Sequence, residues 1–392
     1  MNKKLHAQTI AIRGTRTNSQ YNEHSSAMYF SSSFTFENAQ QAHALFLGEL
    51  DGYTYSRTAN PTVDAFASRV AQLEYAEAGL ATSSGMAAAQ ATFLSLLKSG
   101  DHIIASKNLF GSNTSLVNTL PNHGIAIDFV ASTDIDAWEK LVRPNTKMFF
   151  LETPSNPLLN LLDIEALSNV AHKHNALLVV DNTFCTSALQ QPLKLGADIS
   201  IQSATKGIDG QGRAIGGVIC GSKNLIEELH VYVRTAGQVL SPFNAWVLMS
   251  GLETLFVRMQ KQCETAYALA LWLQNLPQIK HVYYPFLENH PQYELAKKQQ
   301  AYGGVVLSIA INGGQKEAWK FIDSLQLFSR TSNLGDVKST ATHPYTTTHV
   351  RVPNEEKDAS GITDNIVRLS IGLEHIDDLK DDLQNALNQC TL

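Results

Sequence analysis

The sequence predicts an α/β protein with a large, mostly parallel sheet, a smaller C-terminal α+β domain and an N-terminal arm. Between residues 60 and 221, short apolar strand-like runs alternate with helical patterns, which is typical of a parallel sheet covered on both faces. After Gly221 the alternation ends, and a long helical stretch leads into a shorter set of strands and helices. At 392 residues, 44% of them hydrophobic, the chain can bury two packed cores.

Residues 1–59 are expected to form the arm. This segment lacks clear periodicity and is rich in Ser, Thr, Asn and aromatic residues, so it cannot build a core alone, and we expect it to reach across a partner subunit. From Asn60 the pattern changes. Pro61–Leu73 has a proline at a helix start and apolar residues at helical spacing, which predicts a helix.

The middle of the chain contains six strand-like runs, and helical patterns lie between most of them. The runs are His102–Ala105, Ile125–Val130, Met148–Glu152, Leu177–Val180, Ile199–Ile201 and Ile215–Cys220. Helical patterns cover Ser112–Leu120 and Asp163–His174, and Ser83–Gln90 reads as a glycine turn that opens a helix. We assign residues 60–250 to the large domain.

The last third of the chain is expected to form the smaller domain, residues 251–392. A helical stretch runs from about Pro242 to Leu276, and we place the domain boundary inside it. Gly304–Ile311 and Val367–Ile371 are expected to be strands, and Ile376–Leu387 a closing helix.

Composition excludes several functional classes. The formal net charge of -6 gives no support to nucleic-acid binding. Charged residues are only 17% of the chain, which indicates extensive buried surface and subunit contacts.

The four cysteines are scattered without a CxxC pair, as expected of reduced thiols. We find no signal peptide and no apolar run long enough for a bilayer, so we expect a soluble, cytoplasmic protein. His172 and His174 lack further ligands at matching spacing, and we predict no metal site.

The main candidates for catalysis follow the ends of two predicted strands. Asp181 ends an apolar run, so its carboxylate should emerge at the carboxyl edge of the sheet, where open α/β folds bind ligands. The next strand leads into Lys206. A lysine held where water is scarce loses its proton more easily and can form a Schiff base with an aldehyde. An aspartate could keep a pyridine nitrogen protonated, so the pair could hold pyridoxal phosphate. Taken singly, Lys206 also fits a solvated turn and Asp181 a helix cap.

Several other residues could bind the phosphate. The backbone amides of Gly85 and Met86 should point outward at a helix start, where the helix dipole favours an anion, although a plain N-cap explains the same residues. Ser203 and Thr205 add hydroxyl donors beside the lysine. Arg57 can bind phosphate in a planar fork, or it can belong to a surface turn.

Three more residues could contact a ring or a substrate. Asn156 could donate to a phenolate oxygen, or it could serve the turn before a proline. Phe110 could stack on a ring, although most phenylalanines fill cores. Arg368 lies in a short apolar strand, where a lone guanidinium needs an anion. A substrate carboxylate and a structural Asp or Glu are both candidates for that anion.

Together these segments resemble one family, the fold-type I pyridoxal-phosphate enzymes of cysteine and methionine metabolism. It includes cystathionine γ-synthase, methionine γ-lyase and the homoserine-ester sulfhydrylases. The resemblance extends from about Gly52 to the C-terminus. It is carried by the motifs Tyr55–Thr62, Ser84–Met86, Asp181–Phe184, Leu195–Asp198, Ser203–Lys206 and Arg368–Gly372. It implies a large sheet of seven strands.

The resemblance also implies roles for these residues. Lys206 would be covalently bound to pyridoxal 5'-phosphate as the Schiff-base lysine, and Asp181 would be the partner of the pyridine nitrogen. Arg368 would bind the substrate α-carboxylate, with Asn333 near it, although Asn333 replaces a frequent serine. The other expected cofactor contacts are Gly85, Met86, Phe110, Asn156, Thr183, Ser203 and Thr205, together with Tyr55 and Arg57 from the neighbouring subunit. A dimer would then be the smallest active unit, and the family resemblance suggests a homotetramer built from two dimers.

Within the family, Asp209–Arg213, Leu240–Trp246 and Asn333–Ser339 are most similar to the O-succinylhomoserine sulfhydrylases. Phe110, where many members have tyrosine, favours this branch, and Ser112, where methionine γ-lyases have cysteine, weakens the lyase alternative. The resemblance implies γ-replacement on an O-acylhomoserine, expected to be O-succinylhomoserine, with sulfide to give homocysteine in methionine biosynthesis.

Other functions stay open at this point. A cystathionine γ-synthase would use cysteine in place of sulfide, and a γ-lyase would release a keto acid. A non-catalytic binding protein of the same fold is the remaining alternative. One departure has no explanation in the sequence: Gly207 follows the lysine where the family usually has an aromatic residue, and it could loosen the turn that carries Lys206.

Overall fold

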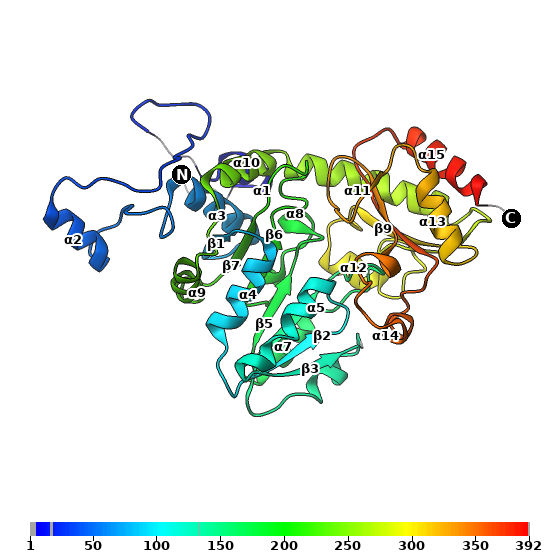
Figure 1. Cartoon of the computed structure of the whole chain (residues 1–392), viewed down its shortest axis with the longest axis horizontal. Coiled ribbons are helices and arrows are strands. Elements are labelled where there is room, and N and C mark those ends of the chain that lie inside the picture. The colour runs from blue at the N-terminus through cyan, green and yellow to red at the C-terminus, as the bar shows by residue number, and fades with distance from the viewer. Residues whose placement is uncertain (1–4, 16–18, 132, 391–392) are drawn as a thin grey trace.

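The computed structural model describes residues 5–15, 19–131 and 133–390. Within these residues the predicted α/β architecture is present, with a seven-stranded sheet and a separate five-stranded sheet. Figure 1 shows the two sheets side by side, joined by the long helix α11, with the N-terminal segment extending from the opposite end.

The larger sheet has the strand order β1-β7-β6-β5-β4-β2-β3. Its strands are β1 (Ala78–Thr82), β2 (His102–Ser106), β3 (Ala126–Val130), β4 (Thr146–Glu152), β5 (Leu177–Asp181), β6 (Ile199–Ser203) and β7 (Gly217–Gly221). Neighbouring strands are parallel except that β7 runs antiparallel to both β1 and β6. The mostly parallel sheet is therefore confirmed. The edge strand β1 was missed, because it is short and contains alanine and glycine in place of β-branched residues.

Helices cover both faces of this sheet. They are α3 (Pro61–Glu74), α4 (Gly85–Leu96), α5 (Gly111–Val117), α6 (Ile135–Glu139), α7 (Ile164–Lys173), α8 (Thr186–Leu189) and α9 (Lys223–Ala236). Val179 on β5 packs in the core beneath α4 and α9, whereas its neighbours Leu178 and Val180 pack in the core beneath α7. Because side chains alternate along a strand, Asp181 lies on the same face as Val179, the face covered by α4.

The long helix predicted from Pro242 to Leu276 is two helices, α10 (Pro242–Glu253) and α11 (Leu255–Leu273). Thr254 breaks the helical backbone between them, with φ of -109° and ψ of 4°. The buried Arg258 explains the break. Its guanidinium donates to the carbonyl oxygens of Gly207 (2.9 Å), Ile208 (3.2 Å) and Gly251 (2.8 Å), which holds the end of α10 against the segment after Lys206.

The smaller sheet has the order β10-β11-β12-β9-β8. Its strands are β8 (Ile279–Tyr283), β9 (Val306–Ile311), β10 (Ser329–Arg330), β11 (Thr340–Thr342) and β12 (Ile366–Ser370). Helices α12 (Tyr293–Gln299), α13 (Gln315–Ser324), α14 (Asn354–Ala359) and α15 (Ile376–Gln389) accompany it. The predicted strands at β9 and β12 and the closing helix α15 are present. The central strand β12 lies between β11 and β9 and carries Arg368. The Arg368 side chain reaches the larger domain, where it donates to Asn156 in the loop after β4.

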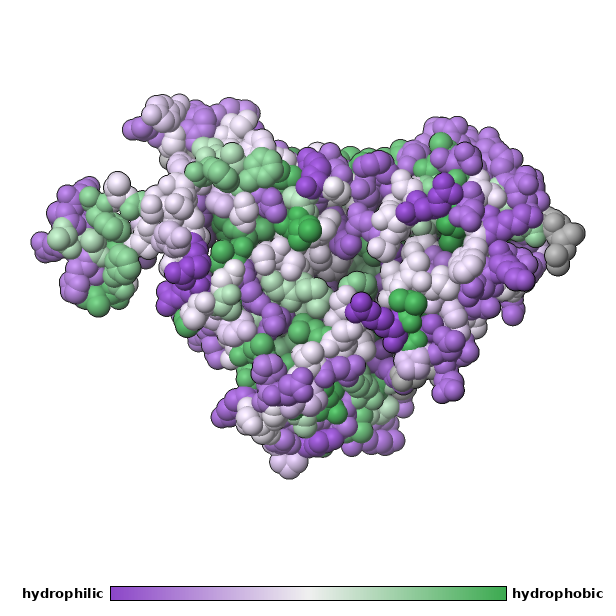
Figure 2. Space-filling view, in the orientation of Figure 1, coloured by the Kyte–Doolittle hydropathy of each residue, from purple (hydrophilic) through white to green (hydrophobic). Residues whose placement is uncertain are grey.

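The N-terminal 59 residues include one part that packs on the body and one part that projects from it. Residues 1–4 and 16–18 lie outside the described part of the chain. Helix α1 (Ala7–Arg13) packs on α3 and α10 of its own subunit, so the first part of the segment is fixed to the body. Helix α2 (Ala39–Leu47) has no buried residue and projects from the body in Figure 1. Figure 2 shows hydrophobic residues on this projection, where Phe46 is 74% exposed.

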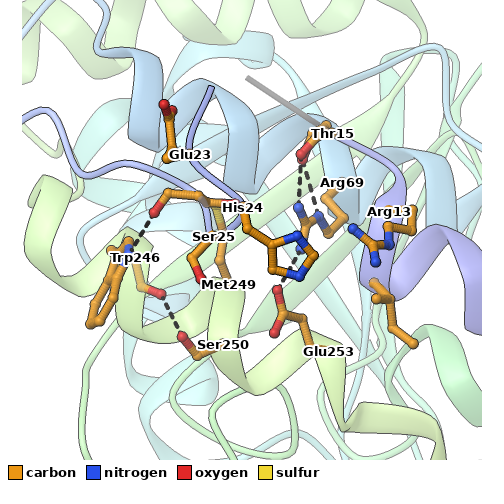
Figure 3. Close-up of a pocket in the computed structure, with 12 residues that line it drawn as sticks. Arg13, Thr15, Glu23, His24, Ser25, Arg69, Trp246, Met249, Ser250 and Glu253 are labelled. Carbon is orange, nitrogen blue, oxygen red and sulfur yellow. Dashed lines mark hydrogen bonds and ion pairs between the residues drawn. The ribbon is translucent and has the colours of Figure 1, made fainter. Parts of the chain in front are cut away.

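A small pocket marks the root of the projecting segment (Figure 3). Its volume is about 240 Å³. On one side the buried Arg69 donates to Thr15 Oγ1 (3.0 Å) and to the Thr15 carbonyl (2.8 Å). On the other side the Trp246 indole donates to the Ser26 carbonyl (3.0 Å). These contacts fix the chain before and after the pocket. Further along, Tyr29 is bonded to Thr62 (2.9 Å) and Asn60 (2.9 Å), so the projecting part begins beyond Tyr29.

Across the described residues, no helix combines the length and apolar character needed to cross a membrane.

Candidate active site

The turn after β6 holds Lys206. Its Nζ donates a hydrogen bond of 2.8 Å to Oδ1 of Asn333. Burial lowers the pKa of the Lys206 ammonium to about 8, and the nearby Arg368 cation adds to this shift. A lysine with a lowered pKa is a better nucleophile and proton carrier near neutral pH, so the environment suits a covalent bond to an aldehyde.

Gly207 does not loosen this turn. A Cβ at position 207 would come within 2.9 Å of Thr186 Cγ2, and a Cβ on Gly335 would lie 2.9 Å from the Gly207 nitrogen. The turn is therefore packed closely against two other segments, and the Gly207 carbonyl accepts from the buried Arg258. The glycine permits this close packing, and the expected effect of an aromatic residue at this position is a clash.

Two carboxyl groups lie at the ends of neighbouring strands. Asp181 ends β5 and Glu152 ends β4, and the two residues are directly paired in the sheet register. Asp181 accepts hydrogen bonds from the Thr183 amide (3.1 Å) and the Asn113 side chain (3.1 Å), and burial raises its pKa. Glu152 is 3% exposed. Burial, followed by the charge of Asp181, raises its pKa well above its usual range.

The start of α4 lies against the end of β6. Ser84 caps α4 by accepting the Ala87 amide (3.1 Å). A Cβ on Gly85 would lie 2.7 Å from Ser203 Cβ, so only glycine lets the helix start approach the strand so closely. The helix N-terminus and the Ser203 hydroxyl are thus brought together, an arrangement that suits phosphate. Thr183 supports this arrangement, because its hydroxyl oxygen accepts a hydrogen bond from the backbone amide of Ser203 (2.8 Å).

Arg368 faces the same site from the smaller sheet. It is 1% exposed, and burial lowers its pKa to about 10. Its Nη1 donates to Asn156 Oδ1 (3.2 Å), and its Nη2 donates to the carbonyls of Ser332 (2.8 Å) and Asn333 (3.2 Å). Its Nε is buried without a hydrogen-bond partner among the described residues. A buried guanidinium without a carboxylate bonded to it can still bind an anion.

These residues surround one cavity of about 580 Å³, a size typical of small-molecule sites, roughly 300–1,000 Å³. It is lined by ten of the predicted site residues, namely Gly85, Met86, Phe110, Asn156, Asp181, Thr183, Ser203, Thr205, Lys206 and Arg368. The carboxyl groups lie at one part of the lining, the helix N-terminus with its hydroxyls at another, and Lys206 also lines it. This set fits pyridoxal phosphate, which needs an acid for its ring nitrogen, donors for its phosphate and an amine for its aldehyde.

Three predicted residues do not line this cavity. Asn333 does not line it but contacts two residues that do, Lys206 through its side chain and Arg368 through its backbone carbonyl. Tyr55 and Arg57 line a different surface pocket, with Leu240 and Pro242. Arg57 is exposed, and its guanidinium donates to the Arg234 carbonyl (2.7 Å). Within one chain these two side chains are therefore separate from the other expected phosphate contacts.

The site also contains a residue that the sequence analysis missed. Glu152 was assigned only as the end of a strand. Its Oε2 accepts the backbone amide of Phe110 (2.8 Å), and its side chain lines the cavity. The available signal was its position at the carboxyl end of a strand, the same signal that identified Asp181. Among the described residues, no group of three His, Cys, Asp or Glu side chains is placed to hold a metal ion.

Comparisons with known proteins agree with this geometry. The family model for the Cys/Met metabolism PLP-dependent enzymes matches residues 8–388. Over 380 residues the chain is 50% identical to an O-succinylhomoserine sulfhydrylase of Pseudomonas aeruginosa, covering 97% of this chain and 94% of the relative. It is 39% identical to an L-methionine gamma-lyase of Fusobacterium nucleatum over 391 residues, 99% of each chain. The structure of a cystathionine gamma synthase from Xanthomonas oryzae, with aminoacrylate and cysteine, matches 98% of each chain with a TM-score of 0.94 and 33% identity.

Proposed function

Because this chain belongs to the Cys/Met metabolism PLP-dependent enzymes, we propose that it catalyses γ-replacement on an O-acylhomoserine with sulfide. The acyl group would be succinyl and the product homocysteine, an intermediate of methionine biosynthesis. The observation that carries this proposal is the near full-length similarity to an O-succinylhomoserine sulfhydrylase. Reduced, scattered cysteines are compatible with a cytoplasmic biosynthetic enzyme.

The cofactor residues follow from the cavity described above. When bound, pyridoxal phosphate supplies an aldehyde that bonds to amines and a ring that accepts electrons from bonds broken at the substrate. Lys206 would hold the cofactor covalently. Asp181 would keep its ring nitrogen protonated, with Phe110 against the ring and Asn156 near its phenolate oxygen. Gly85, Met86, Ser203 and Thr205 would bind the phosphate, and Thr183 would support this set through Ser203.

Lys206 would also carry the protons of the reaction. An amine with a pKa of about 8 can both accept and donate a proton near neutral pH. After substrate has displaced it, the Lys206 amine would take the proton from the α carbon and then one from the β carbon. The γ C–O bond would then break and release succinate, sulfide would add at the γ carbon, and the amine would return the protons. Asn333 would orient this amine through its side-chain oxygen, which accepts from Nζ.

Arg368 would bind the substrate α-carboxylate. Its buried guanidinium is fixed in place by Asn156 and by two backbone carbonyls, while the Nε hydrogen remains available. Lys206 and Arg368 are the only cationic side chains that the described part of one chain contributes to the cavity lining.

A cystathionine γ-synthase activity is the second candidate, supported by the structural similarity to such an enzyme. The two candidates differ in the product. Purified protein is supplied with O-succinylhomoserine and either sulfide or cysteine, and the amino-acid product is identified by mass spectrometry. We expect homocysteine with sulfide as the preferred reaction. Preferred formation of cystathionine from cysteine would assign the second activity, and a keto acid without added thiol would assign a γ-lyase.

The active unit would be at least a homodimer, and the full assembly a tetramer of two dimers. Tyr55 and Arg57 lie outside the cavity of their own chain, so they would complete the phosphate site of a partner. The exposed hydrophobic residues of the projecting segment support such a contact. Mixing the inactive variants Arg57→Ala and Lys206→Ala tests this assignment. Random exchange in a dimer should restore about a quarter of the activity if Arg57 acts across the interface, and none if it acts within its own chain.

A further inference from the structure

Glu152 and Asp181 form a pair of acidic side chains at the cavity wall. They are paired across β4 and β5 and lie on the same face of the sheet. Among the described residues, Arg368 from β12 is the cation that lowers the pKa of Glu152. This effect is smaller than the increases caused by burial and by Asp181. Each of two neighbouring carboxyl groups in a buried site disfavours ionisation of the other, which favours a proton on one of them.

Hydrogen bonding decides which carboxyl is ionised. Asp181 accepts from the Thr183 amide on one oxygen and from the Asn113 side chain on the other. Glu152 accepts one described hydrogen bond, from the Phe110 amide to Oε2. Donors that point at both oxygens favour the charged form, so Asp181 is the better anion. Glu152 is also the more deeply buried of the two, since Asp181 is partly open to the cavity.

We propose that Glu152 is a positioning residue of the cofactor site that acts as a neutral carboxylic acid. It fixes the Phe110 backbone at the start of α5, and it leaves Asp181 as the single anion on this wall of the cavity. The inference rests on the proposed function, because it assumes that Phe110 and Asp181 contact the cofactor ring. It assigns a role to a buried acid that the proposed proton transfers do not use.

Two substitutions separate the two parts of this role. Glu152→Gln keeps an oxygen that can accept the Phe110 amide and carries no charge. Glu152→Ala leaves the Phe110 amide without its partner. The first readout is the dissociation constant of pyridoxal phosphate from the apoenzyme, and the second is the pH at which the visible absorption of the bound cofactor changes.

We expect Glu152→Gln to behave like the wild type, with a dissociation constant within about threefold and an absorption midpoint within about half a pH unit. Glu152→Ala should weaken cofactor binding by about tenfold or more, because a buried amide loses its acceptor. A midpoint shift of about one unit or more in Glu152→Gln would show an ionised Glu152 and overturn the proposal. Wild-type affinity in Glu152→Ala would overturn the positioning role.

A measurement on the apoenzyme keeps the test independent of the cofactor. A carboxyl that stays protonated in the folded chain destabilises the fold as pH rises above 4.5, its usual pKa. The melting temperature of Glu152→Gln should therefore rise relative to the wild type as pH increases from that value. A constant difference would contradict a neutral Glu152. For the cofactor readouts, Glu74→Gln is the matched control, since Glu74 is a buried acid outside the cavity lining and its replacement should leave cofactor binding unchanged.

These results can be distinguished from a failure of the proposed function. The cofactor readouts do not depend on the acyl group or on the sulfur donor. An enzyme that binds pyridoxal phosphate but makes another product would refute only the proposed reaction. Normal products combined with a shifted absorption midpoint in Glu152→Gln would refute only the role of Glu152.

Discussion

The Nζ of Lys206 lies 2.8 Å from Oδ1 of Asn333 and donates a hydrogen bond to it. The backbone carbonyl of Asn333 accepts from Arg368 (3.2 Å). One residue therefore contacts both the amine that we assign to proton transfer and the guanidinium that we assign to the substrate carboxylate.

Asn333→Ala should lower kcat by about tenfold, because the Lys206 amine loses one hydrogen bond that orients it. Cofactor binding should change little, since Asn333 does not line the cavity. Steady-state kinetics with O-succinylhomoserine and sulfide measure the effect. Asn333→Ser, which restores a short acceptor, serves as the matched comparison. An unchanged kcat in Asn333→Ala would mean that the bond does not position the amine during turnover.

Attachment of pyridoxal phosphate to the apoenzyme should become faster as pH rises, with half of the change at about 8, the lowered pKa of Lys206. The sign follows from the chemistry, because only the neutral amine attacks the aldehyde and protonation dominates below that pH. Stopped-flow absorption in the visible range follows the reaction. A midpoint near 10.5, the ordinary lysine value, would contradict the buried environment of this side chain.

Arg368→Lys should raise KM for O-succinylhomoserine by at least about 30-fold, because lysine cannot reproduce a planar fork at a buried carboxylate. The three hydrogen bonds that fix the guanidinium would also be lost. The visible spectrum of the bound cofactor should remain, which separates substrate binding from cofactor binding. A wild-type KM with a normal spectrum would show that the substrate carboxylate binds elsewhere.

Glu74→Gln should stabilise the protein at neutral and alkaline pH. Burial raises the pKa of Glu74 to about 7, while Asn182 and Gln202 donate to its carboxyl. Because the folded chain holds this proton more tightly than the unfolded chain, wild-type stability falls as pH rises from 4.5 through about 7. The gain from the substitution should be small at pH 4.5 and approach about 3 kcal/mol above pH 7. Urea unfolding at several pH values measures it, and a gain independent of pH would contradict a protonated Glu74.

The sequence allowed prediction of those parts of the fold in which local pattern and tertiary role agree. Apolar runs such as Leu177–Val180 became buried strands, and polar residues directly after them, such as Asp181, reached the cavity. The ends of parallel strands meet at one edge of the sheet, so the order along the chain was enough to bring Asp181, Ser203 and Lys206 together.

The missed features depend on contacts between distant segments. The break at Thr254 follows from the hydrogen bonds of Arg258 to carbonyls near Lys206, and no local pattern encodes those. Strand β1 has weak intrinsic preference and is held by its pairing with β7. Glu152 becomes informative only through its register with Asp181, which depends on how two strands align in space.

The most direct test of the central claim is chemical labelling of Lys206. Purified enzyme loaded with pyridoxal phosphate is reduced with borohydride, digested and analysed by mass spectrometry, with Lys206→Ala as the control. The account predicts the mass of the reduced cofactor on the peptide that contains Lys206, together with loss of visible absorption and turnover in the variant. Cofactor attached to a different lysine, or an active and coloured Lys206→Ala enzyme, would contradict it.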